Sequence, residues 1–423
     1  MNLDDFLSAK PLFYDVIDYE RFPKAYRIIE SALPSPKIIH LVGTNGKGST
    51  GRFLATALNR AGKRVGHYTS PHILRFNERI WLDGSDVRDE TLEAAHQKLF
   101  ALLSVEDTKA LSYFEYTTLL AMVVYEGCEY VVMEAGLGGE FDATAVFPKT
   151  LSIFTPIDVD HAAFLGRSIE SIASTKLRSM QRIALLGEQK HSEVETIARA
   201  IAEAKGCELY TLAERLTPYI EEIALHLATK NTLSDYLRDN LMLAMAAYEM
   251  LGYKASEELF DQNALFGRLS RIASNITLDV GHNPLAAREI ARAYDGKKVV
   301  LIYNTYGDKD YREILEILKP IIESVEIIEV SEGRIVPRED LEGALDDMGI
   351  PYRSFDAINT DKEYLVFGSF SVAETFLHRH SREGGNPAAG MDPRIKTRVP
   401  LAKRCFLESE DDGSKRLHKG NNL

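Results

Sequence analysis

"LVGTNGKGST" spans residues 41–50 and begins at the end of the apolar run "KIIHLV". The segment that follows, "GSTGRFLATALNRAG", carries apolar residues at helical spacing from Phe53 to Leu58 and reaches a helix-stopping glycine at Gly62. A strand, a glycine-rich loop and a helix in this order form a cradle for phosphate. Glycines let backbone N–H groups face an anion, the helix N-terminus adds partial positive charge, and Lys47 adds a full one.

The loop departs from the common phosphate-loop pattern G-x-x-x-x-G-K-[ST]. Gly46 and Lys47 match it, but Leu41 stands at the position of the first glycine, and Gly48 separates Lys47 from Ser49. Because a strand pattern precedes the loop and a helix pattern follows it, we interpret it as a variant phosphate loop. The alternative is a glycine-rich turn between strand and helix with a solvated lysine.

The composition favours a two-domain protein of the cytoplasm. A chain of 423 residues with 45% apolar residues suits two domains with cores of their own. The net charge of −13 without a basic block disfavours a nucleic-acid scaffold. The acidic start "MNLDDFLSAK" is no signal peptide, no apolar run has membrane-spanning length, and the three cysteines are isolated from one another. We therefore expect a reducing cytoplasm and no membrane partner.

Short runs rich in β-branched or aromatic residues alternate with helical patterns along the chain. The runs are KIIHLV, KRVGHYT, YVVMEAG, LSIFTPI, SNITLDV, KKVVLIY, VEIIEV and EYLVFGS. This alternation predicts an α/β fold with parallel sheets that are buried on both faces. Binding sites in such sheets lie at the carboxyl ends of the strands.

Polar residues follow several of these strands. Glu134 ends "YVVME", and a carboxylate at the end of a buried strand favours a bound cation such as magnesium; the alternative is a helix cap. Asp142 lies within reach of the same region. Ser70, in "TSPHILRFNERI", offers a hydroxyl to a cation or caps a turn. His161 follows the strand "LSIFT", and its imidazole is either a metal ligand or a satisfied core histidine.

Other charged residues have simpler alternatives. On pattern alone, Lys176 in "RSIESIASTKLRSM" is an exposed helix lysine. Arg268 in "LFGRLSRI" could reach a polyphosphate from a second lobe or be a surface charge. Asp279 ends the strand in "ITLDVGHNP" and could hold a ribose or a base edge. Asp308 or Asp310 in "NTYGDKDYREIL" could serve as a helix N-cap.

Nine motifs together resemble those of the folylpolyglutamate synthase/dihydrofolate synthase family, a branch of the Mur-ligase-like ATP-dependent amide ligases. They read GTNGKGS, TSPHILRFNERI, YFEYTT, EAGLGGEFDAT, DHAAFLG, FGRLSRI, LDVGHNP, GDKD and VFGSF. They occur in family order over about residues 18–370. The resemblance implies a P-loop-containing ATP-binding domain with a mostly parallel sheet over residues 1–264. It also implies a smaller Rossmann-like α/β ligase domain over residues 265–378, with the active site between the two domains.

The resemblance also implies the roles of individual residues. Those expected to hold ATP are Gly43, Thr44, Asn45, Gly46, Lys47, Gly48, Ser49, Asn240, Arg268, Asp279 and His282. Those expected to bind two magnesium ions are Ser49, Ser70, Glu134 and His161. Those expected to line the pterin site are Ser112, Tyr113, Phe114, Glu115, Phe141, Asp142 and Ala143. The expected catalytic residues are Lys47, Lys176, His161 and Arg268. Lys176 matches a family lysine that CO2 can carbamylate, which turns a cation into an anion able to bind magnesium.

The chain departs from the family pattern at four places. Glu140 stands where the family usually has arginine, and Ala145 where it usually has asparagine. Tyr236 and Leu237 replace the pair "HQ" that precedes the nucleotide asparagine, and "KLRS" replaces "KAGI" after the helix lysine. Residues 379–423 are rich in glycine, proline and charge, and we predict that they form a disordered or loosely attached tail.

The function implied is ATP-dependent ligation of L-glutamate. A dihydrofolate synthase joins glutamate to 7,8-dihydropteroate, and a folylpolyglutamate synthase extends the polyglutamate tail of a reduced folate. In both reactions an acyl phosphate forms first, and the amine of glutamate then attacks it. The expected partners are these small molecules, without nucleic acid, and the expected state is a monomer.

Two other functions remain as alternatives. A Mur-type peptidoglycan ligase shares the loop and the chemistry, but it needs a further N-terminal domain, and here the loop begins only about forty residues into the chain. A non-catalytic nucleotide-binding switch protein would bind nucleotide without glutamate-dependent release of ADP. The carboxylates at several strand ends and His161 favour an enzyme.

Overall fold

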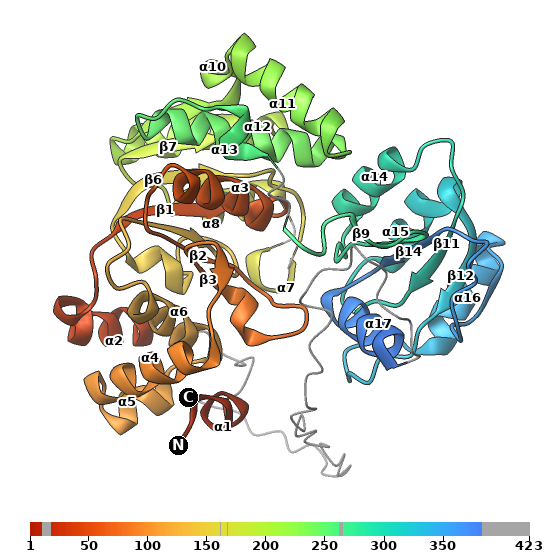
Figure 1. Ribbon diagram of the computed structural model, residues 1–423, viewed down its shortest axis with the longest axis horizontal. Coiled ribbons are helices and arrows are strands. Elements are labelled where there is room, and N and C mark those ends of the chain that lie inside the picture. The colour runs from red at the N-terminus through yellow and green to blue at the C-terminus, as the bar shows by residue number, and fades with distance from the viewer. Residues whose placement is uncertain (11–17, 161, 167, 262–264, 383–423) are drawn as a thin grey trace, which may run out of the picture.

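The computed structural model describes residues 1–10, 18–160, 162–166, 168–261 and 265–382. Two β-sheets organise these residues into two lobes that lie side by side (Figure 1). We call the described residues up to 261 the N-terminal lobe and residues 265–382 the C-terminal lobe. His161 and residues 383–423 of the expected tail lie outside the described residues.

The N-terminal lobe contains an eight-stranded sheet in the order β4-β3-β2-β5-β1-β6-β7-β8. Its strands are β1 (Lys37–Val42), β2 (Val65–Tyr68), β3 (Ile80–Leu82), β4 (Ser85–Asp86), β5 (Tyr130–Glu134), β6 (Lys149–Phe154), β7 (Ile183–Leu186) and β8 (Glu208–Thr211). In this order the neighbouring strands β2, β5, β1, β6, β7 and β8 are parallel. The strands β3 and β4 pair antiparallel and form one edge of the sheet. The mostly parallel sheet predicted from the sequence is confirmed.

The strand β1 lies at the centre of this sheet, between β5 and β6. Successive side chains of a strand point to opposite faces, so a central strand buried on both faces is mostly apolar. Ile38 packs into the core on one face, whereas Ile39 and Leu41 pack into the core on the other. This run therefore places the loop that follows it at the middle of the sheet edge.

Helices cover both faces of the sheet (Figure 1). One core joins α1 (Leu3–Ser8), α2 (Arg21–Ile29), α4 (Asp89–Leu102) and α6 (Tyr113–Val124). The opposite core joins α3 (Lys47–Arg60), α11 (Pro218–Lys230), α12 (Asp235–Met250) and α13 (Glu257–Phe260). A further core packs α8 (Ile169–Leu177) and α9 (Ser192–Lys205) against β6 and β7. The short helices are α5 (Val105–Ala110), α7 (Ala162–Leu165), α10 (Leu212–Arg215), η1 (Glu30–Ala32), η2 (Phe76–Arg79) and η3 (Ala143–Val146).

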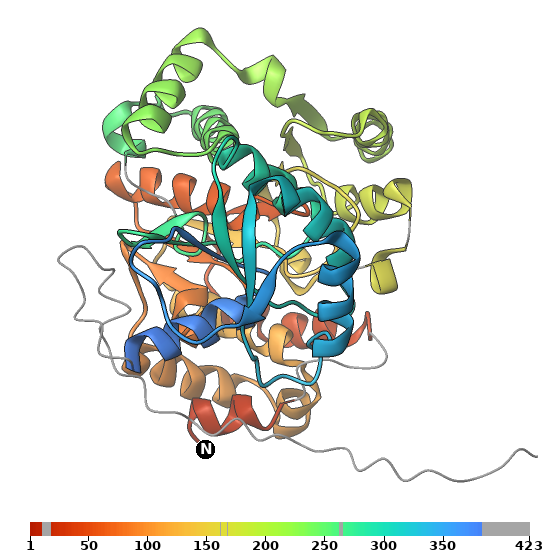
Figure 2. The ribbon, with the colours of Figure 1, turned by 90° about the vertical axis from the view of Figure 1, so that its right-hand side faces the viewer.

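The C-terminal lobe contains a six-stranded sheet in the order β13-β12-β11-β14-β10-β9. Its strands are β9 (Ser270–Ala273), β10 (Ile276–Leu278), β11 (Val299–Tyr303), β12 (Ile322–Ile327), β13 (Tyr352–Ser354) and β14 (Tyr364–Phe367). All pairs are parallel except β9 with β10. Figure 2 turns this lobe toward the viewer. One face packs against α14 (Pro284–Ala293), α15 (Tyr311–Leu318) and α16 (Arg338–Met348), with η4 (Lys319–Ile321), and the other against α17 (Phe370–Arg382).

A segment of the N-terminal lobe reaches into the core of the C-terminal lobe. Ile73, between β2 and β3, is 4% exposed and packs in the cluster that contains Ile272 and Val280. A Cβ on Gly267 would lie 2.6 Å from the Cδ1 atom of Ile73. The lobes therefore share apolar contacts beside the segment that connects them.

All eight strand-like runs of the sequence are strands in the structure. The strands β3, β4, β7, β8, β9 and β13 were not predicted. Most of these are short edge strands, and the alanine and leucine residues of β7 have strong helix propensity. The helix α17 includes residues 379–382, which the sequence placed in the tail. Within the described ranges, no helix has both the length and the apolar character that crossing a membrane requires.

A test of the packing on the sheet uses two glycines. A Cβ on Gly66 of β2 would lie 2.3 Å from the ring of Tyr125, whereas nothing lies within 4 Å of a Cβ on Gly343 of α16. We expect Gly66→Ala to destabilise the protein by about 1–3 kcal/mol through overpacking. Gly343→Ala should stabilise it by about 0.5–1 kcal/mol, because alanine favours a helix interior. Thermal midpoints measured by calorimetry check both values, and equal shifts for the two variants would contradict the packing described.

Candidate active site

The phosphate loop lies between β1 and α3, where close contacts require glycine at two positions. Gly46 has φ +90° and precedes the first residue of α3, and a Cβ there would lie 2.5 Å from Oδ1 of Asn240. A Cβ on Gly43 would lie 2.9 Å from the backbone oxygen of Thr155. The first N–H groups of α3 have no partner within the helix, so they are available to an anion over the loop.

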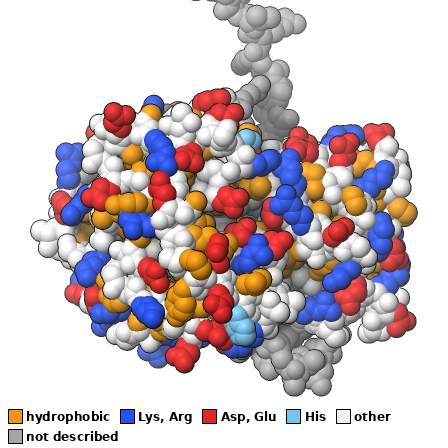
Figure 3. Space-filling model, turned by 90° about the horizontal axis from the view of Figure 1, so that it is seen from above, with side chains coloured by type: hydrophobic (Ala, Val, Ile, Leu, Met, Phe, Trp, Pro, Cys, Tyr) orange, Lys and Arg blue, Asp and Glu red, His pale blue; other side chains and the backbone are white. Residues whose placement is uncertain are grey.

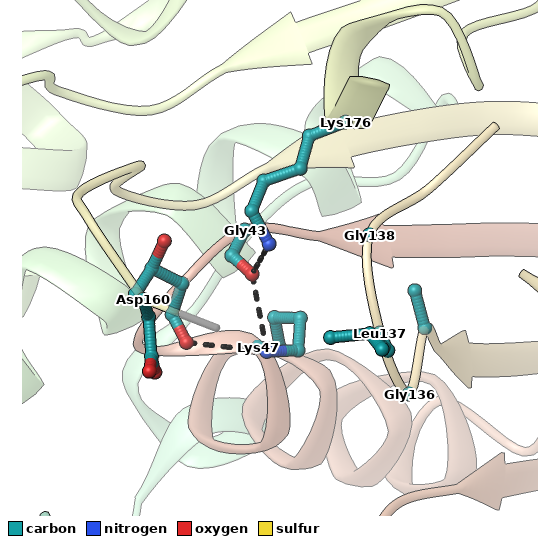
Figure 4. Close-up of a pocket in the computed structure, with 9 residues that line it drawn as sticks. Gly43, Lys47, Gly136, Leu137, Gly138, Asp160 and Lys176 are labelled. Carbon is teal, nitrogen blue, oxygen red and sulfur yellow. Dashed lines mark hydrogen bonds between the residues drawn. The ribbon is translucent and has the colours of Figure 1, made fainter. Parts of the chain in front are cut away.

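Two lysines converge on this loop from different helices (Figure 4). Lys47 Nζ donates to the carbonyl oxygens of Gly43 and Thr44, each at 3.2 Å. Lys176 Nζ, from α8, donates to the same Gly43 oxygen at 2.9 Å. Around both lies a small pocket that is lined by Gly43, Thr44, Lys47, Ala135, Gly136, Leu137, Gly138, Asp160 and Lys176.

The helical pattern alone predicted that Lys176 is exposed, and this prediction was wrong. Lys176 is 4% exposed and does not lie on the outer surface of its helix. Burial, together with the nearby cation of Lys47, lowers the pKa of Lys176 from 10.5 to about 7. The helix period could not show this, because the pocket that surrounds the amine is formed by the distant segments after β1 and β5.

The residues expected to hold a metal include one buried hydroxyl without a partner. Glu134 ends β5 and is 5% exposed, and its carboxylate accepts hydrogen bonds from the Thr69 hydroxyl and, at 3.3 Å, from the backbone N–H of Ser70. Lys47 Nζ lies 3.9 Å from this carboxylate. The Ser49 hydroxyl is buried and bonds to no described residue.

A carboxylate and a hydroxyl are the hard oxygen donors that magnesium prefers, so these residues fit a divalent cation. Within the described ranges, no cluster of three or more histidine, cysteine, aspartate or glutamate residues could hold a metal on its own. Since His161 lies outside those ranges, its expected part in the metal site stays a prediction.

Polar contacts join the two lobes beside the phosphate loop. Asn45 and Asn283 exchange a pair of amide hydrogen bonds, each 3.0 Å long. Asp160 accepts from Lys309 Nζ at 2.8 Å and from Asn283 Nδ2 at 3.3 Å. The side chains of Asp160 and Lys309 are 9% and 8% exposed. Each of these contacts matches a donor or acceptor of one lobe with its counterpart in the other, so together they specify how the two lobes are arranged.

A larger cavity of about 270 Å³ lies between the lobes. Ten of the eleven residues expected to hold ATP line it, all except Gly43, and those outside the phosphate loop are Asn240, Arg268, Asp279 and His282. The phosphate loop forms one end, and the helices α12 and α14 form the walls that lead away from it. Burial lowers the pKa of His282, which favours the neutral imidazole. Seen from above, acidic and basic side chains are interspersed over the surface of both lobes (Figure 3).

The residues expected at the pterin site come from two segments. Ser112 caps α6: its hydroxyl accepts from the Glu115 N–H at 3.1 Å, and Glu115 accepts from the Ser112 N–H at 2.6 Å. Arg21 binds the same Glu115 carboxylate with two hydrogen bonds of 2.9 and 3.1 Å. Glu115 is therefore held by structural contacts. Phe141 is 58% exposed, and its ring lies 4.5 Å from that of Tyr19.

These two segments meet the lysine pocket at Gly136 and Leu137. A Cβ on Gly136 would lie 2.6 Å from the Phe114 ring. Asp142 accepts from the backbone N–H of Leu137 at 2.9 Å, and its burial raises the pKa of its carboxyl group. Tyr113 stacks its ring under the Arg79 guanidinium at 5.3 Å, and Ala143 is buried. The structure thus joins the expected pterin segments to the expected phosphate site.

Two departures from the family pattern contact each other. Glu140, in place of the usual arginine, lies 3.5 Å from the guanidinium of Arg178, which belongs to the departing "KLRS" segment. The side chain at residue 140 is therefore negative where the family usually has a positive one, and the positive Arg178 lies beside it. The Ala145 carbonyl accepts from Lys149 Nζ at 2.8 Å, a contact that any residue could provide through its backbone.

Sequence reasoning missed Lys309, although it expected one of its neighbours to cap a helix. Asp310 does cap α15, where it accepts from the Glu313 N–H at 3.0 Å. Lys309 itself lies inside the motif "GDKD", and nothing in the local pattern shows that its partner is Asp160 in the other lobe.

Known proteins were compared with the chain in three ways. No model of a protein family matches it. A dihydrofolate synthase/folylpolyglutamate synthase from Haemophilus influenzae is 32% identical over 332 residues, which are 69% of this chain and 74% of the relative. The protein of the same name from Escherichia coli is 29% identical over 386 residues, which are 83% of this chain and 89% of the relative.

Solved structures show the same relationship. Helicobacter pylori folylpolyglutamate synthetase superposes with a TM-score of 0.73 at 40% identity and covers 89% of this chain and 97% of its own. Escherichia coli FolC in complex with DHPP and ADP gives a TM-score of 0.76 at 25% identity and covers 90% and 98%. These relatives support a folate ligase over a Mur-type ligase or a nucleotide switch. The chain belongs to the dihydrofolate synthase/folylpolyglutamate synthase family, and it is an ATP-dependent ligase with the two-lobed α/β fold of that family.

Proposed function

We propose that this ligase joins L-glutamate to 7,8-dihydropteroate and also extends the polyglutamate tail of reduced folates, with ATP converted to ADP and phosphate. One observation carries the proposal: the expected pterin segments and the phosphate loop meet at Gly136 and Leu137. A carboxylate presented from the pterin side would therefore lie beside the terminal phosphate of a nucleotide in the cavity. The relatives whose names combine both activities support the two-reaction form.

The first step is transfer of the γ-phosphoryl group to the acceptor carboxylate. A carboxylate oxygen forms a bond to phosphorus, the bond to the ADP oxygen breaks, and an acyl phosphate results. Catalysis of this step depends mainly on position and charge. The N–H groups at the start of α3, with Lys47 beside them, would hold the phosphates. Arg268 would add positive charge from the C-terminal lobe.

Magnesium is the metal that this donor set fits. Glu134 and Ser49 would hold it together with Ser70, and His161 and a second ion complete the proposed arrangement. A bound magnesium ion supplies positive charge that neutralises the anionic phosphate oxygens.

The second step forms the amide bond. The amine of glutamate attacks the acyl carbon, a C–N bond forms, the bond between that carbon and the phosphate oxygen breaks, and the proton lost from nitrogen leaves with the released phosphate. Water competes with the amine for the acyl phosphate, so the site has to be closed. The buried pair of Asp160 and Lys309 and the paired amides of Asn45 and Asn283 would hold the lobes closed during this step.

Lys176 would carry a carbamate. The carbamate forms when a neutral amine attacks CO2, and the buried position of Lys176 lowers its pKa enough to populate that form near neutral pH. The cytoplasmic location, the monomeric state and the absence of a nucleic-acid partner stay predictions.

The proposed substrates can be tested directly with purified protein. We expect ADP release in the presence of ATP, magnesium and L-glutamate when either 7,8-dihydropteroate or tetrahydrofolate is added, and none when glutamate is left out. Release with only one of the two pteridines restricts the protein to the corresponding reaction. No glutamate-dependent release with either one would contradict the proposal.

Lys47→Ala should lower kcat at least about 100-fold, because it removes a full charge from the phosphate site. Far-ultraviolet circular dichroism should stay unchanged. Lys63→Ala is the matched control, since Lys63 lies just beyond the other end of α3 and pairs with Glu129 at 3.2 Å. Near-normal turnover of Lys47→Ala would refute the assignment of the loop.

The carbamate at Lys176 can be detected by 13C NMR with labelled bicarbonate. The amine is protonated below the pKa of about 7 and neutral above it, so the signal should appear at pH 8 and be lost toward pH 6. Lys176→Met should show no signal at either pH. A wild-type spectrum without a carbamate signal at pH 8 would contradict the proposed carbamate at Lys176.

A further inference from the structure

Tyr236 occupies a position where the chain departs from the family pattern, and its hydroxyl contacts the opposite lobe at the nucleotide cavity. The residue lies in the first turn of α12, in the N-terminal lobe. Its hydroxyl donates to Oδ2 of Asp279 at 3.1 Å, and Asp279 follows β10 of the C-terminal lobe. Both residues line the cavity between the lobes. The hydrogen bond therefore ties one wall of the nucleotide cavity to the other.

Asp279 in turn organises the backbone of its own lobe. It is 4% exposed, and besides Tyr236 it accepts from the N–H of Leu269 at 2.9 Å and from the N–H of Gly281 at 2.7 Å. A buried carboxylate needs such donors. Burial and the Asp279 charge raise the pKa of Tyr236 well above 10, so the phenol stays protonated and remains a donor. Asp279 thus accepts three hydrogen bonds within the protein, and its expected role toward a ribose stays a prediction.

The turn that Asp279 holds is the one that carries Arg268. Leu269 has φ +44°, in the left-handed region that side chains rarely adopt, and its N–H is fixed by Asp279. Ser270 Oγ accepts from the N–H groups of Gly267 and Arg268 at 2.9 and 3.3 Å. Three successive N–H groups are therefore held by side chains, and the direction of the Arg268 side chain follows from this turn.

The Arg268 guanidinium lies in the same cavity. It donates to the Gly267 carbonyl at 3.1 Å and lies 5.5 Å from the centre of the Phe370 ring. An arginine at this place can reach nucleotide phosphates only if its turn is held at the right distance from α12. The hydrogen bond between Tyr236 and Asp279 spans this distance.

We propose that Tyr236 is a positioning residue for the ligase reaction. Through Asp279 it fixes the position of the turn that carries Arg268, and thereby the binding of the nucleotide phosphates by the C-terminal lobe. The proposal rests on the proposed function only for the identity of the acid substrate, because the positioning concerns the nucleotide. Tyr236 touches Asp279 and acts on the phosphates through Arg268.

A mutant cycle tests the coupling. The variants are Tyr236→Phe, Arg268→Ala and the double variant, with Tyr248→Phe as control. Phenylalanine keeps the ring, so the packing of α12 should persist. Tyr248 lies on the same helix, is 2% exposed and packs in the core that α3, α11 and α12 form on one face of the N-terminal sheet. Thermal midpoints establish that all four proteins fold.

The main measurement is the affinity for a non-hydrolysable ATP analogue with magnesium, by calorimetry. Tyr236→Phe should weaken binding about tenfold, as expected for a hydrogen bond to a charged group, and Tyr248→Phe less than twofold. In the Arg268→Ala background, Tyr236→Phe should change the affinity less than twofold, because the group that it positions is gone. The proposal would be overturned if Tyr236→Phe left the affinity for the ATP analogue unchanged. It would also be overturned if the double variant lost affinity by the product of the two single-variant factors.

The binding measurement needs neither folate nor glutamate, so it separates this proposal from the proposed substrates. Steady-state kinetics provide the second readout: Tyr236→Phe should raise KM for ATP and leave KM for glutamate within twofold of wild type. A rise confined to KM for glutamate would place Tyr236 with the amino-acid substrate and contradict its role at the phosphates.

Discussion

The close approach of the phosphate loop to its neighbours is the constraint on which the rest of the site depends. At Gly43 and Gly46 the loop lies so near to Thr155 and Asn240 that a Cβ would collide with them. The carbonyl of Gly43 is also the point on which Lys47 and Lys176 converge. Because β1 is buried on both faces at the centre of the sheet, this loop cannot shift without disturbing two cores. The geometry of the phosphate site is therefore fixed by packing before any ligand binds.

The C-terminal lobe supplies the remaining walls of the nucleotide cavity. Its polar contacts with the first lobe form two groups, of which one contains Asn45, Asp160, Asn283 and Lys309 and the other Tyr236 and Asp279. An acyl phosphate is lost to water unless it is enclosed, and a ligase that moves a phosphoryl group between two anions needs cations from more than one direction. Two lobes that meet over a rigid loop satisfy both needs.

Much of this arrangement could be predicted from the sequence, where local pattern and strand ends carry the information. The loop, the eight buried strands and the carboxylate Glu134 at a strand end are local features, and the periodicity of burial reveals them. Residues whose environment comes from distant segments could not be predicted. Lys176 is buried by loops after β1 and β5, and Lys309 finds its partner in the other lobe. The edge strands were missed because short, half-exposed runs have no clear period.

One site built from the phosphate loop, Glu134 and Ser49 should hold the nucleotide and its metal between the two lobes. A crystal structure with a non-hydrolysable ATP analogue and Mn²⁺, with anomalous data collected at the manganese edge, tests it most directly. We expect an anomalous peak within bonding distance of the Glu134 carboxylate and the Ser49 hydroxyl, with the phosphates over the first turn of α3. Manganese bound elsewhere, or a nucleotide whose phosphates lie away from Lys47, would contradict it.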